Sequence, residues 1–449
     1  MKLASPFDQI VLGFLGLIVL LIGLVLARGD QVGAQVAATY PADGGLVSAR
    51  GQVGVAFKQS MRADTFADRF RIQPETAGQV IWEGNTLWFR PSKPFAPGTA
   101  YSVEISPGGL SKDGRVFKQD LRFRFQIRPV EVLYLSVGEE NPNLWRKSTS
   151  GGDAIQLTFT SGGVYDYAAS PDGGQIAYSA LNTQKGTDLW LVGRDGKQNR
   201  QLASCGPDRC IQAAWTPDGR QLVYERKKAG PTQTANGAPG GIYSVDLASS
   251  SSAFLFPGAD PSWSPDGQWL VASDPKGSRI GITNVDTGEQ VQVQASLDQV
   301  PTWFPDGSKI LYSNLQVSLG IPQERVYAID FQSKQVSPIL NDDVEQVEYT
   351  LPAISPDGQW MVTSLHLMAG GQTRQLWLMD IHGKQRKAIT HDELVNYSHY
   401  SWDPWGKSIL FQQFSMGSSD ALPQVSVWDR ETGQIHLLAE AAALPEWLP

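Results

Sequence analysis

The sequence repeats one short phrase, Ser264-Pro265-Asp266-Gly267, and the copies are evenly spaced along most of the chain. The proline of the phrase recurs at positions 171, 217, 265, 305, 356, 404 and 449, in steps of 46, 48, 40, 51, 48 and 45 residues. Proline presets φ at the first corner of a turn, aspartate bonds its own backbone, and glycine accepts a positive φ. Because alternating apolar residues follow the phrase, each copy predicts a tight turn between two β-strands.

A strand-bearing repeat with a period in the forties is typical of the blades of a β-propeller. Each repeat reads as one strand before the turn and three after it. Residues 130–158 contain the last three strands of a unit, and residues 444–448 form a first strand without successors. The two remnants complete one blade, so we predict seven blades, closed by the carboxyl-terminal strand. Six blades is the alternative, if the segment after Val130 is a linker.

A tryptophan lies two residues before the repeated proline in most repeats. A large ring at one fixed place per repeat suits packing between neighbouring blades, and we interpret these side chains as core. The tryptophans are Trp215, Trp263, Trp303, Trp402 and Trp447.

Length and composition bound the possible functions. At 449 residues the chain is too long for one ordinary domain, and its 41% hydrophobic content allows substantial cores. The formal net charge of -8 leaves no basic stripe for a phosphate backbone, so we expect no nucleic-acid partner.

Residues 10–27 are all apolar or glycine. As a helix, this run would be about 27 Å long, close to the hydrocarbon thickness of a bilayer. We predict a cytoplasmic stub and transmembrane anchor over residues 1–28 and a linker over 29–38. The rest of the chain is then extracytoplasmic, in the periplasm or at the cell surface. A signal peptide cleaved after Val25-Leu26-Ala27 is the alternative.

Residues 39–128 read as short alternating strands, which predict a β-sandwich. This stretch resembles the bacterial Ig-like domain of the SbsA type. Such domains are spacers and binding modules on bacterial exteriors, so the resemblance implies an extracytoplasmic location and no catalysis. The resemblance depends on residues 40–44 (Tyr-Pro-Ala-Asp-Gly), 55–61, 87–91 and 97–101.

Residues 129–449 resemble the TolB-type propeller repeat, a WD-like family. Its units read Pro-x-Trp-Ser-Pro-Asp-Gly, which residues 261–267 match fully and residues 403–406 do not. The resemblance implies an all-β fold, a propeller after the Ig-like sandwich. The resemblance says little about function, because the same propeller fold occurs in binding proteins, lyases and peptidase domains.

Connections between strands fall on two faces of a propeller, because consecutive strands of a blade alternate in direction. The turn face carries the Pro-Asp-Gly turns and other short turns. The loop face carries the long connections, including residues 226–241, 315–325, 366–374 and 414–424, and long loops are where recognition usually resides. We predict that it binds a partner through Asp260, Asp298, Asp342, Asp343, Glu345, Glu348, His391, His399 and Tyr400.

The predicted loop face is acidic, so a cationic peptide or a protein patch would suit it. A divalent cation with oxygen ligands is a further option that no motif supports, and we predict no cofactor. The only cysteines, Cys205 and Cys210, are expected to form a disulfide in an oxidising compartment. Two free thiols are the alternative.

No catalytic motif accompanies the repeats. A Gly-x-Ser-x-Gly elbow is missing, and the spacing of His391 and His399 is wrong for a zinc helix. We therefore predict a membrane-anchored scaffold, not an enzyme, whose loop face binds an envelope protein or peptide. The alternative is a propeller lyase or hydrolase acting on polysaccharide or peptide, with His366, His391 and His399 as metal ligands.

Overall fold

The computed structural model places the chain in two compact units. The first comprises residues 1–47 and 51–127, and the second comprises residues 48–50 and 128–449. The residues that the structure describes are 6–27, 33–230, 240–274, 279–295, 300–318, 321–331, 333–340, 347–367, 373–418 and 420–449. Four of the predicted binding residues, Asp298, Asp342, Asp343 and Glu345, lie outside these described residues.

The apolar amino-terminal run forms helix α1 (Pro6–Ala27). Within the described part of the chain, no helix has the length and apolar character needed to cross a membrane. The transmembrane anchor predicted over residues 1–28 is therefore not supported.

The first unit is a β-sandwich of two four-stranded sheets. One has the strand order β1-β3-β6-β5 and the other β2-β8-β7-β4. Its core is aromatic: Phe66, Phe95 and Phe125 are fully buried, and the rings of Tyr101 and Phe125 stack with centroids 5.2 Å apart. The strands are β1 (Val36–Tyr40), β2 (Gly45–Val47), β3 (Val53–Phe57), β4 (Phe70–Gln73), β5 (Gly78–Glu83), β6 (Thr86–Pro91), β7 (Ala100–Ile105) and β8 (Leu121–Ile127).

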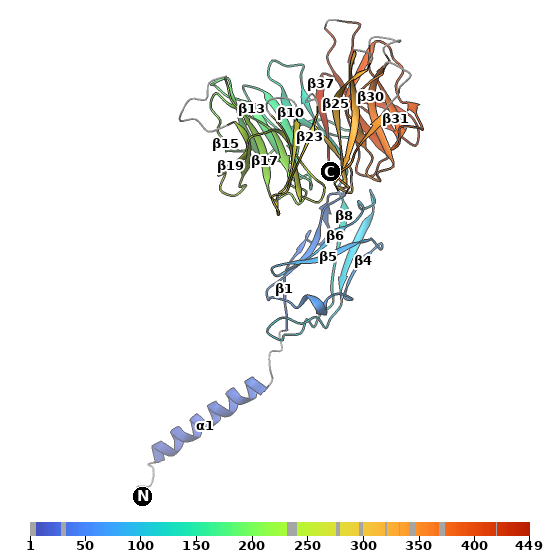
Figure 1. Ribbon diagram of the computed structural model, residues 1–449. Helices are drawn as coiled ribbons and strands as arrows, with labels where there is room; N and C mark the ends of the chain where they lie inside the picture. Colours follow the sequence, from blue (N-terminus) through green and yellow to red (C-terminus); the bar gives the residue numbers. More distant parts are fainter. Residues whose placement is uncertain are drawn as a thin grey trace. The chain divides into compact units, whose positions relative to one another are not determined.

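The second unit consists of successive antiparallel sheets, which Figure 1 shows as fans of strands following one another in chain order. The first three groups of strands are β9 (Glu131–Ser136), β10 (Asn143–Ser148) and β11 (Ile155–Gln156); β12 (Val164–Ala169), β13 (Gln175–Leu181), β14 (Thr187–Gly193) and β15 (Arg200–Ala203); and β16 (Arg209–Trp215), β17 (Leu222–Lys227), β18 (Gly241–Val245) and β19 (Ser252–Phe256). The second and third groups are joined by one bridge between Thr187 and Arg209.

The remaining groups follow the same order of one strand, a turn and three more strands. They are β20 (Ala259–Trp263), β21 (Trp269–Ser273), β22 (Arg279–Asn284) and β23 (Gln290–Gln294); β24 (Thr302–Trp303), β25 (Lys309–Ser318), β26 (Ile321–Asp330) and β27 (Val336–Leu340); β28 (Val347–Tyr349), β29 (Ala353–Ile354), β30 (Trp360–Leu367), β31 (Gln375–Asp380) and β32 (Lys387–Ala388); β33 (Val395–Trp402), β34 (Ser408–Ser415), β35 (Gln424–Asp429) and β36 (Ile435–Ala439); and the final strand β37 (Ala442–Leu448). The sequence predicts a long loop over residues 315–325, but the described residues 315–318 and 321–325 belong to β25 and β26, with Leu315 opposite Glu324.

The carboxyl-terminal strand pairs with the first strands of the unit, as predicted. β37 lies antiparallel to β9, with Ala443 opposite Leu135 and Glu446 opposite Leu133, in a sheet of order β11-β10-β9-β37. Leu448 is fully buried in a core cluster that also contains Tyr178 of the next sheet. The apolar core thus lies between adjacent sheets, and the closing strand contributes to it.

Polar contacts also hold β37 against its neighbours. The Tyr167 hydroxyl donates to the carbonyl of Leu444, and the Ala169 N–H donates to Glu446 Oε1 at 3.1 Å. Burial raises the pKa of Glu446 to about 7, and the hydrogen bond from Ala169 offsets only part of this effect. The closing strand therefore carries a carboxyl group that resists ionisation.

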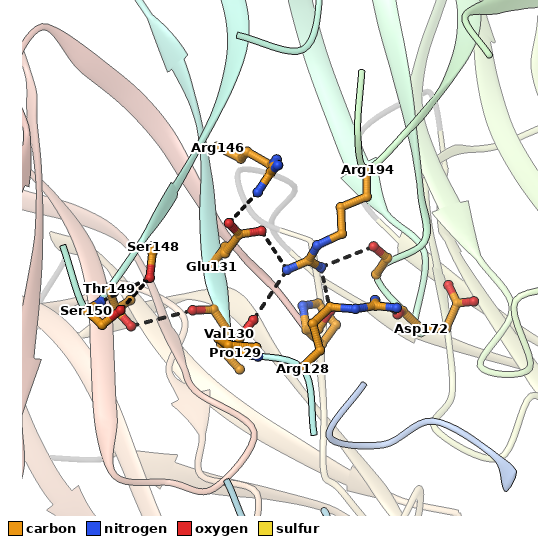
Figure 2. Close-up of polar contacts among 12 residues, drawn as sticks. Arg128, Pro129, Val130, Glu131, Arg146, Ser148, Thr149, Ser150, Asp172 and Arg194 are labelled. Carbon is orange, nitrogen blue, oxygen red and sulfur yellow. Dashed lines mark hydrogen bonds and ion pairs between the residues drawn. The ribbon is translucent and has the colours of Figure 1, made fainter. Parts of the chain in front are cut away.

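Figure 2 shows a second polar cluster near the closure, where Glu131 lies between two arginines. Its carboxylate pairs with Arg146 and, at 2.7 Å, with Arg194. Arg194 also donates to the carbonyl oxygen of Pro449 at 2.7 Å. Burial lowers the pKa of Arg194 to about 10, although the Glu131 charge opposes this. The cluster links β9, β10, the connection after β14 and the end of β37.

The repeated turns have the geometry that their residues predict. Ser264 Oγ donates to Asp266 Oδ1 at 2.5 Å and accepts the N–H of Trp269 at 2.9 Å. The Gln268 N–H donates to the same carboxylate oxygen at 3.0 Å. Gly267 has φ 74°, a conformation that costs glycine little and other residues more. Each phrase therefore closes its own hydrogen-bond network.

The repeated tryptophans lie between neighbouring sheets, as expected for core residues, and several also form specific hydrogen bonds. The indole N–H of Trp215 donates to the carbonyl of Ala168 at 3.0 Å, and that of Trp402 donates to Ala353 at 3.0 Å. Trp447 repeats the contact at the closure, donating to Ser401 at 3.2 Å. Each bond joins the first strand of one sheet to the first strand of the preceding one.

Candidate binding face

Exposed apolar side chains in the second unit gather on the loop face. The connections on that face follow the second and fourth strands of each sheet. Among the described residues, Val285 is the one large exposed apolar side chain in a turn-face connection. Ile155, Val336 and Ile435 are exposed at the turn-face ends of outermost strands, and the other exposed apolar residues outside the loop face lie further along such strands. The exposed apolar residues of the loop face, here named the apolar set, are Phe159, Tyr165, Leu181, Val300, Leu315, Leu394, Phe414, Met416 and Leu422.

Members of the apolar set lie on two neighbouring sheets. The Met416 N–H donates to the Leu394 carbonyl at 2.7 Å, which places the end of β34 beside the start of β33. Leu422 reaches the adjoining sheet, because a Cβ built on Gly138 would lie 4.0 Å from its Cδ1. Phe159, the most exposed of the set at 79%, follows β11 of that same sheet. Exposed apolar groups gathered on one face are typical of interaction surfaces.

The described acidic residues predicted for this face are partly neutralised. Glu348 pairs with Arg374 at 3.0 Å and with His366 Nδ1 at 3.7 Å. Asp208, which borders the cysteine loop, pairs with Arg226 at 2.9 Å and Lys228 at 3.0 Å. Burial raises the pKa of Asp208, but the hydrogen bonds from Lys228 and Arg226 outweigh it and hold the pKa below its ordinary value. The described part of this face is therefore less acidic than its sequence indicates.

The other predicted site residues occupy different environments. His391 is exposed in the connection after β32. His399 Nδ1 lies 3.1 Å from Ser398 Oγ, and the surrounding protein partly desolvates the imidazole and lowers its pKa. The Tyr400 hydroxyl is 2.6 Å from Thr350 Oγ1 and donates to the Leu351 carbonyl at 2.8 Å. Tyr400 thus joins two sheets, which commits its hydroxyl group to structure.

Asp260 belongs to a recurring irregularity of the first strands. Asp260, Gln212, His399 and Leu444 each have a positive φ at a β-bulge three residues before a repeated tryptophan. The bulge interrupts pairing at the loop-face end of the strand and redirects the side chain. The sequence spacing gave no sign of this strained position.

Three carboxyl groups interact at the loop-face end of neighbouring sheets. The Asp260 N–H donates to Glu225 Oε2 at 3.2 Å, and the Gln212 N–H donates to Asp166 Oδ2 at 2.7 Å. Burial raises the pKa of Asp166, Glu225 and Asp260, and the charges of Asp260 and Asp166 raise that of Glu225 further. Within the described ranges, no group of three or more histidine, cysteine, aspartate and glutamate side chains has a geometry that would hold a metal ion.

A disulfide stabilises the loop face beside this region. Cys205 and Cys210 are bonded, with their Cα atoms 6.1 Å apart, and both are buried. Arg226 Nη2 lies 3.5 Å from the Cys205 carbonyl, so the ion pairs of Asp208 and the disulfide fix the same connection.

Sequence reasoning missed the apolar set, although a signal was present. Phe159, Leu394, Met416 and Leu422 lie in predicted connections, where large apolar residues are uncommon unless they pack or bind. The site predicted from the sequence rested on the charged residues of the loops and not on their apolar residues.

The fold defines a class of protein: an all-β chain in which an immunoglobulin-like sandwich precedes a propeller-type domain. Residues 30–126 match the family model of the bacterial Ig-like domain, and residues 127–350 match that of the TolB beta propeller domain. The chain therefore combines a bacterial Ig-like domain with a TolB-type propeller domain, which confirms the resemblance. No curated protein matched the chain.

Solved structures with a similar fold include enzymes and a TolB protein. The oligogalacturonate lyase of Vibrio parahaemolyticus is 13% identical, with 74% of this chain and 98% of that chain covered and a TM-score of 0.51. A prolyl endopeptidase is 14% identical, with 79% and 50% covered and a TM-score of 0.52. TolB from Acinetobacter baumannii is 17% identical, with 72% and 83% covered and a TM-score of 0.43. Identities this low show the fold alone.

Proposed function

We propose that the protein is a binding scaffold of the bacterial cell envelope, not an enzyme, and that its loop face binds the apolar surface of an envelope protein or peptide. The observation that carries this proposal is the unequal distribution of exposed apolar side chains between the two faces. Burial of apolar area contributes about 25 cal/mol per Å², so the apolar set is where a partner would gain most affinity.

The geometry of the face supports protein binding in two further ways. The carboxylates of Asp208 and Glu348 are paired with cations of the same chain, so a partner would not meet these two groups as uncompensated charges. The disulfide between Cys205 and Cys210 and the extended β25–β26 hairpin hold loop-face segments in defined positions. A rigid apolar surface loses little conformational entropy on binding.

We further propose that the folded units are extracytoplasmic and that α1 attaches the chain to a membrane. Disulfides persist in oxidising compartments, which favours the envelope over the cytoplasm. The described apolar side chains of α1 are exposed to solvent, among them Phe14, Leu15 and Leu20, and burial in lipid would remove that exposure. Alkaline phosphatase fused after Pro449 should be active in cells. Activity of a different reporter at the same position, one that functions only in the cytoplasm, would contradict this location.

The arrangement of the propeller also belongs to the proposal. We infer seven blades, with β9, β10, β11 and β37 forming the shared one, because each described group of strands repeats the same antiparallel order. Small-angle scattering of the isolated second unit would test closure, because a ring and an open arc differ in their distance distributions.

Cross-linking in intact cells tests the binding role. A photoreactive phenylalanine analogue at Met416 or Leu394 should give a discrete adduct with an envelope protein. The same analogue at Val285, an exposed apolar position of the turn face, is the matched control and should not give that adduct. Equal adducts from both faces would contradict the proposal.

A second experiment separates binding from folding. The double change Leu394→Glu and Met416→Glu should abolish the adduct formed from a probe at Leu422, because two charges would enter the apolar contact. The unfolding midpoint of the purified protein should stay unchanged, since both side chains are exposed. An adduct that persists in this variant would rule out the apolar set as the binding surface.

A further inference from the structure

A pocket of about 370 Å³ opens between two neighbouring sheets, on the turn face and away from the apolar set. One wall comes from the sheet of β30, β31 and β32, and the other from β35 and the turn that follows it. Its volume is at the lower end of the range for small-molecule sites, which fits one ring better than an extended chain. The lining residues are Trp360, Leu378, Gln385, Arg386, Lys387, Trp428 and Arg430.

A cation from each wall lies over an aromatic ring of the other wall. Lys387 of β32 places its Nζ 6.0 Å from the ring centroid of Trp428, which belongs to the other sheet. Arg430 follows Trp428 and places its guanidinium 4.6 Å from the ring centroid of Trp360, back on the first sheet. Such stacking fixes the cations in place while leaving N–H groups available for a ligand.

Lys387 and Arg430 lack carboxylate partners within the described chain. Arg430 Nη1 has one hydrogen bond, of 3.4 Å to the Gly406 carbonyl, and no ion pair involves either residue. Two acidic residues close to them in sequence, Asp380 and Asp429, are held by their own turns. Asp380 accepts the backbone N–H of Lys384 at 2.8 Å, and Asp429 accepts that of Thr432 at 2.7 Å. In a chain with net charge -8, two uncompensated cations on one pocket form a local positive site.

A comparison within the chain shows that this arrangement is not general. Lys334 also lies over a tryptophan, with its Nζ 5.8 Å from the ring centroid of Trp269. There the ammonium group is paired with Glu289 at 2.5 Å. The same cation–aromatic contact thus occurs once with its carboxylate supplied by the chain and once, at Lys387, without it.

We propose that the pocket between β30–β32 and β35 binds a small anion that combines a carboxylate with a single ring. Arg430 and Lys387 contact the carboxylate, since a guanidinium edge donates two parallel hydrogen bonds to the two carboxylate oxygens. The apolar wall of Trp360, Leu378 and Trp428 packs against the face of the ring. This site is independent of the loop face and of the binding role proposed for it.

Titration calorimetry and ligand-observed NMR with defined probes test the site on the full-length protein. D-Glucuronate and benzoate are the carboxylates, and D-glucose and benzyl alcohol are their uncharged counterparts. Saturable binding of at least one acid, with its uncharged counterpart at least tenfold weaker, is the expected result. The acid that binds more tightly, D-glucuronate or benzoate, shows whether the ring of the natural ligand is a sugar or an aromatic ring. No saturable binding of either acid below about 10 mM would overturn the proposal.

Substitutions then locate the binding in the pocket. Lys387→Gln and Arg430→Gln should each lower the affinity for the acid about tenfold or more, because each removes a charge-assisted contact. Arg430→Lys keeps the charge and should lose less affinity than Arg430→Gln. Lys334→Gln is the matched control and should change the affinity less than twofold. Equal affinities in wild type and Lys387→Gln would overturn the assignment, even if the Arg430 variants proved poorly folded.

Discussion

Glu446 should make the stability of the second unit fall as the pH rises toward neutrality. It lies on the closing strand β37, where burial raises the pKa of its carboxyl group from 4.5 to about 7. A folded state that holds a proton more tightly than the unfolded chain loses stability as that proton is released. The destabilisation caused by ionisation of Glu446 is therefore zero below pH 4.5, grows between pH 4.5 and 7, and is constant above pH 7.

The size of this effect follows from the two pKa values. Each pKa difference of one corresponds to 1.36 kcal/mol, so the shift of Glu446 amounts to about 3 kcal/mol of destabilisation above pH 7. Glu446→Gln removes the ionisable group but keeps an oxygen that can accept the Ala169 N–H, now bonded at 3.1 Å. The variant should be more stable than wild type at pH 8, by up to about 3 kcal/mol, and equal to it near pH 4.5.

Urea unfolding followed by tryptophan fluorescence, repeated between pH 4.5 and 8, measures this difference. Glu440→Gln removes a carboxylate from an exposed position in the connection between β36 and β37 and is the matched control. It should show no comparable change with pH. A Glu446→Gln variant whose stability relative to wild type is the same at pH 4.5 and pH 8 would refute the reasoning.

Three further predictions concern the contacts that fix the sheets and the loop face. Leu448→Ala should lower the free energy of unfolding by about 2–5 kcal/mol in the same assay, because Leu448 is fully buried at the closure; a loss near zero would mean that β37 is dispensable. Replacing Cys205 and Cys210 by serine should cost about 2 kcal/mol, the loop-closure entropy of a bridge with a sequence separation of 5, and treating wild type with dithiothreitol should reproduce the loss. Asp208→Asn should cost about 2 kcal/mol at pH 7, since Arg226 loses a charged partner; because the pKa of Asp208 is lowered, the difference should vanish in acid, and persistence there would contradict the ion-pair origin.

The repeated frame could be predicted from the sequence because local chemistry determines it. The Pro-Asp-Gly turn fixes its own backbone through Ser264 and Asp266, and the spacing of its copies fixes the order of the strands. The pairing of the last strand followed from counting the strands of an incomplete unit. These signals are a local turn motif and the spacing of its copies, so one sequence suffices to read them.

The contacts between repeats could not be read in the same way. The hydrogen bond from Trp402 to Ala353 depends on how two sheets pack. The cation–aromatic contact between Lys387 and Trp428 joins residues 41 positions apart in different sheets. The charge composition of the loops also overstated how acidic the loop face is, because Glu348 pairs with Arg374 only in the folded chain. Pairing of this kind changes which loop residues a partner would meet.

The two faces of the second unit differ in their connections for a physical reason. Turn-face connections are short and hydrogen-bonded within themselves, as at Asp266, so they fix the strands and allow little variation in length. Loop-face connections adjoin first strands that carry a bulge, where Asp260 and His399 adopt a positive φ and the ladder is interrupted. A change of length or residue there disturbs few backbone hydrogen bonds. Exposed apolar side chains can therefore accumulate on the loop face at little cost to folding, and a surface of that kind gains free energy only when a partner covers it.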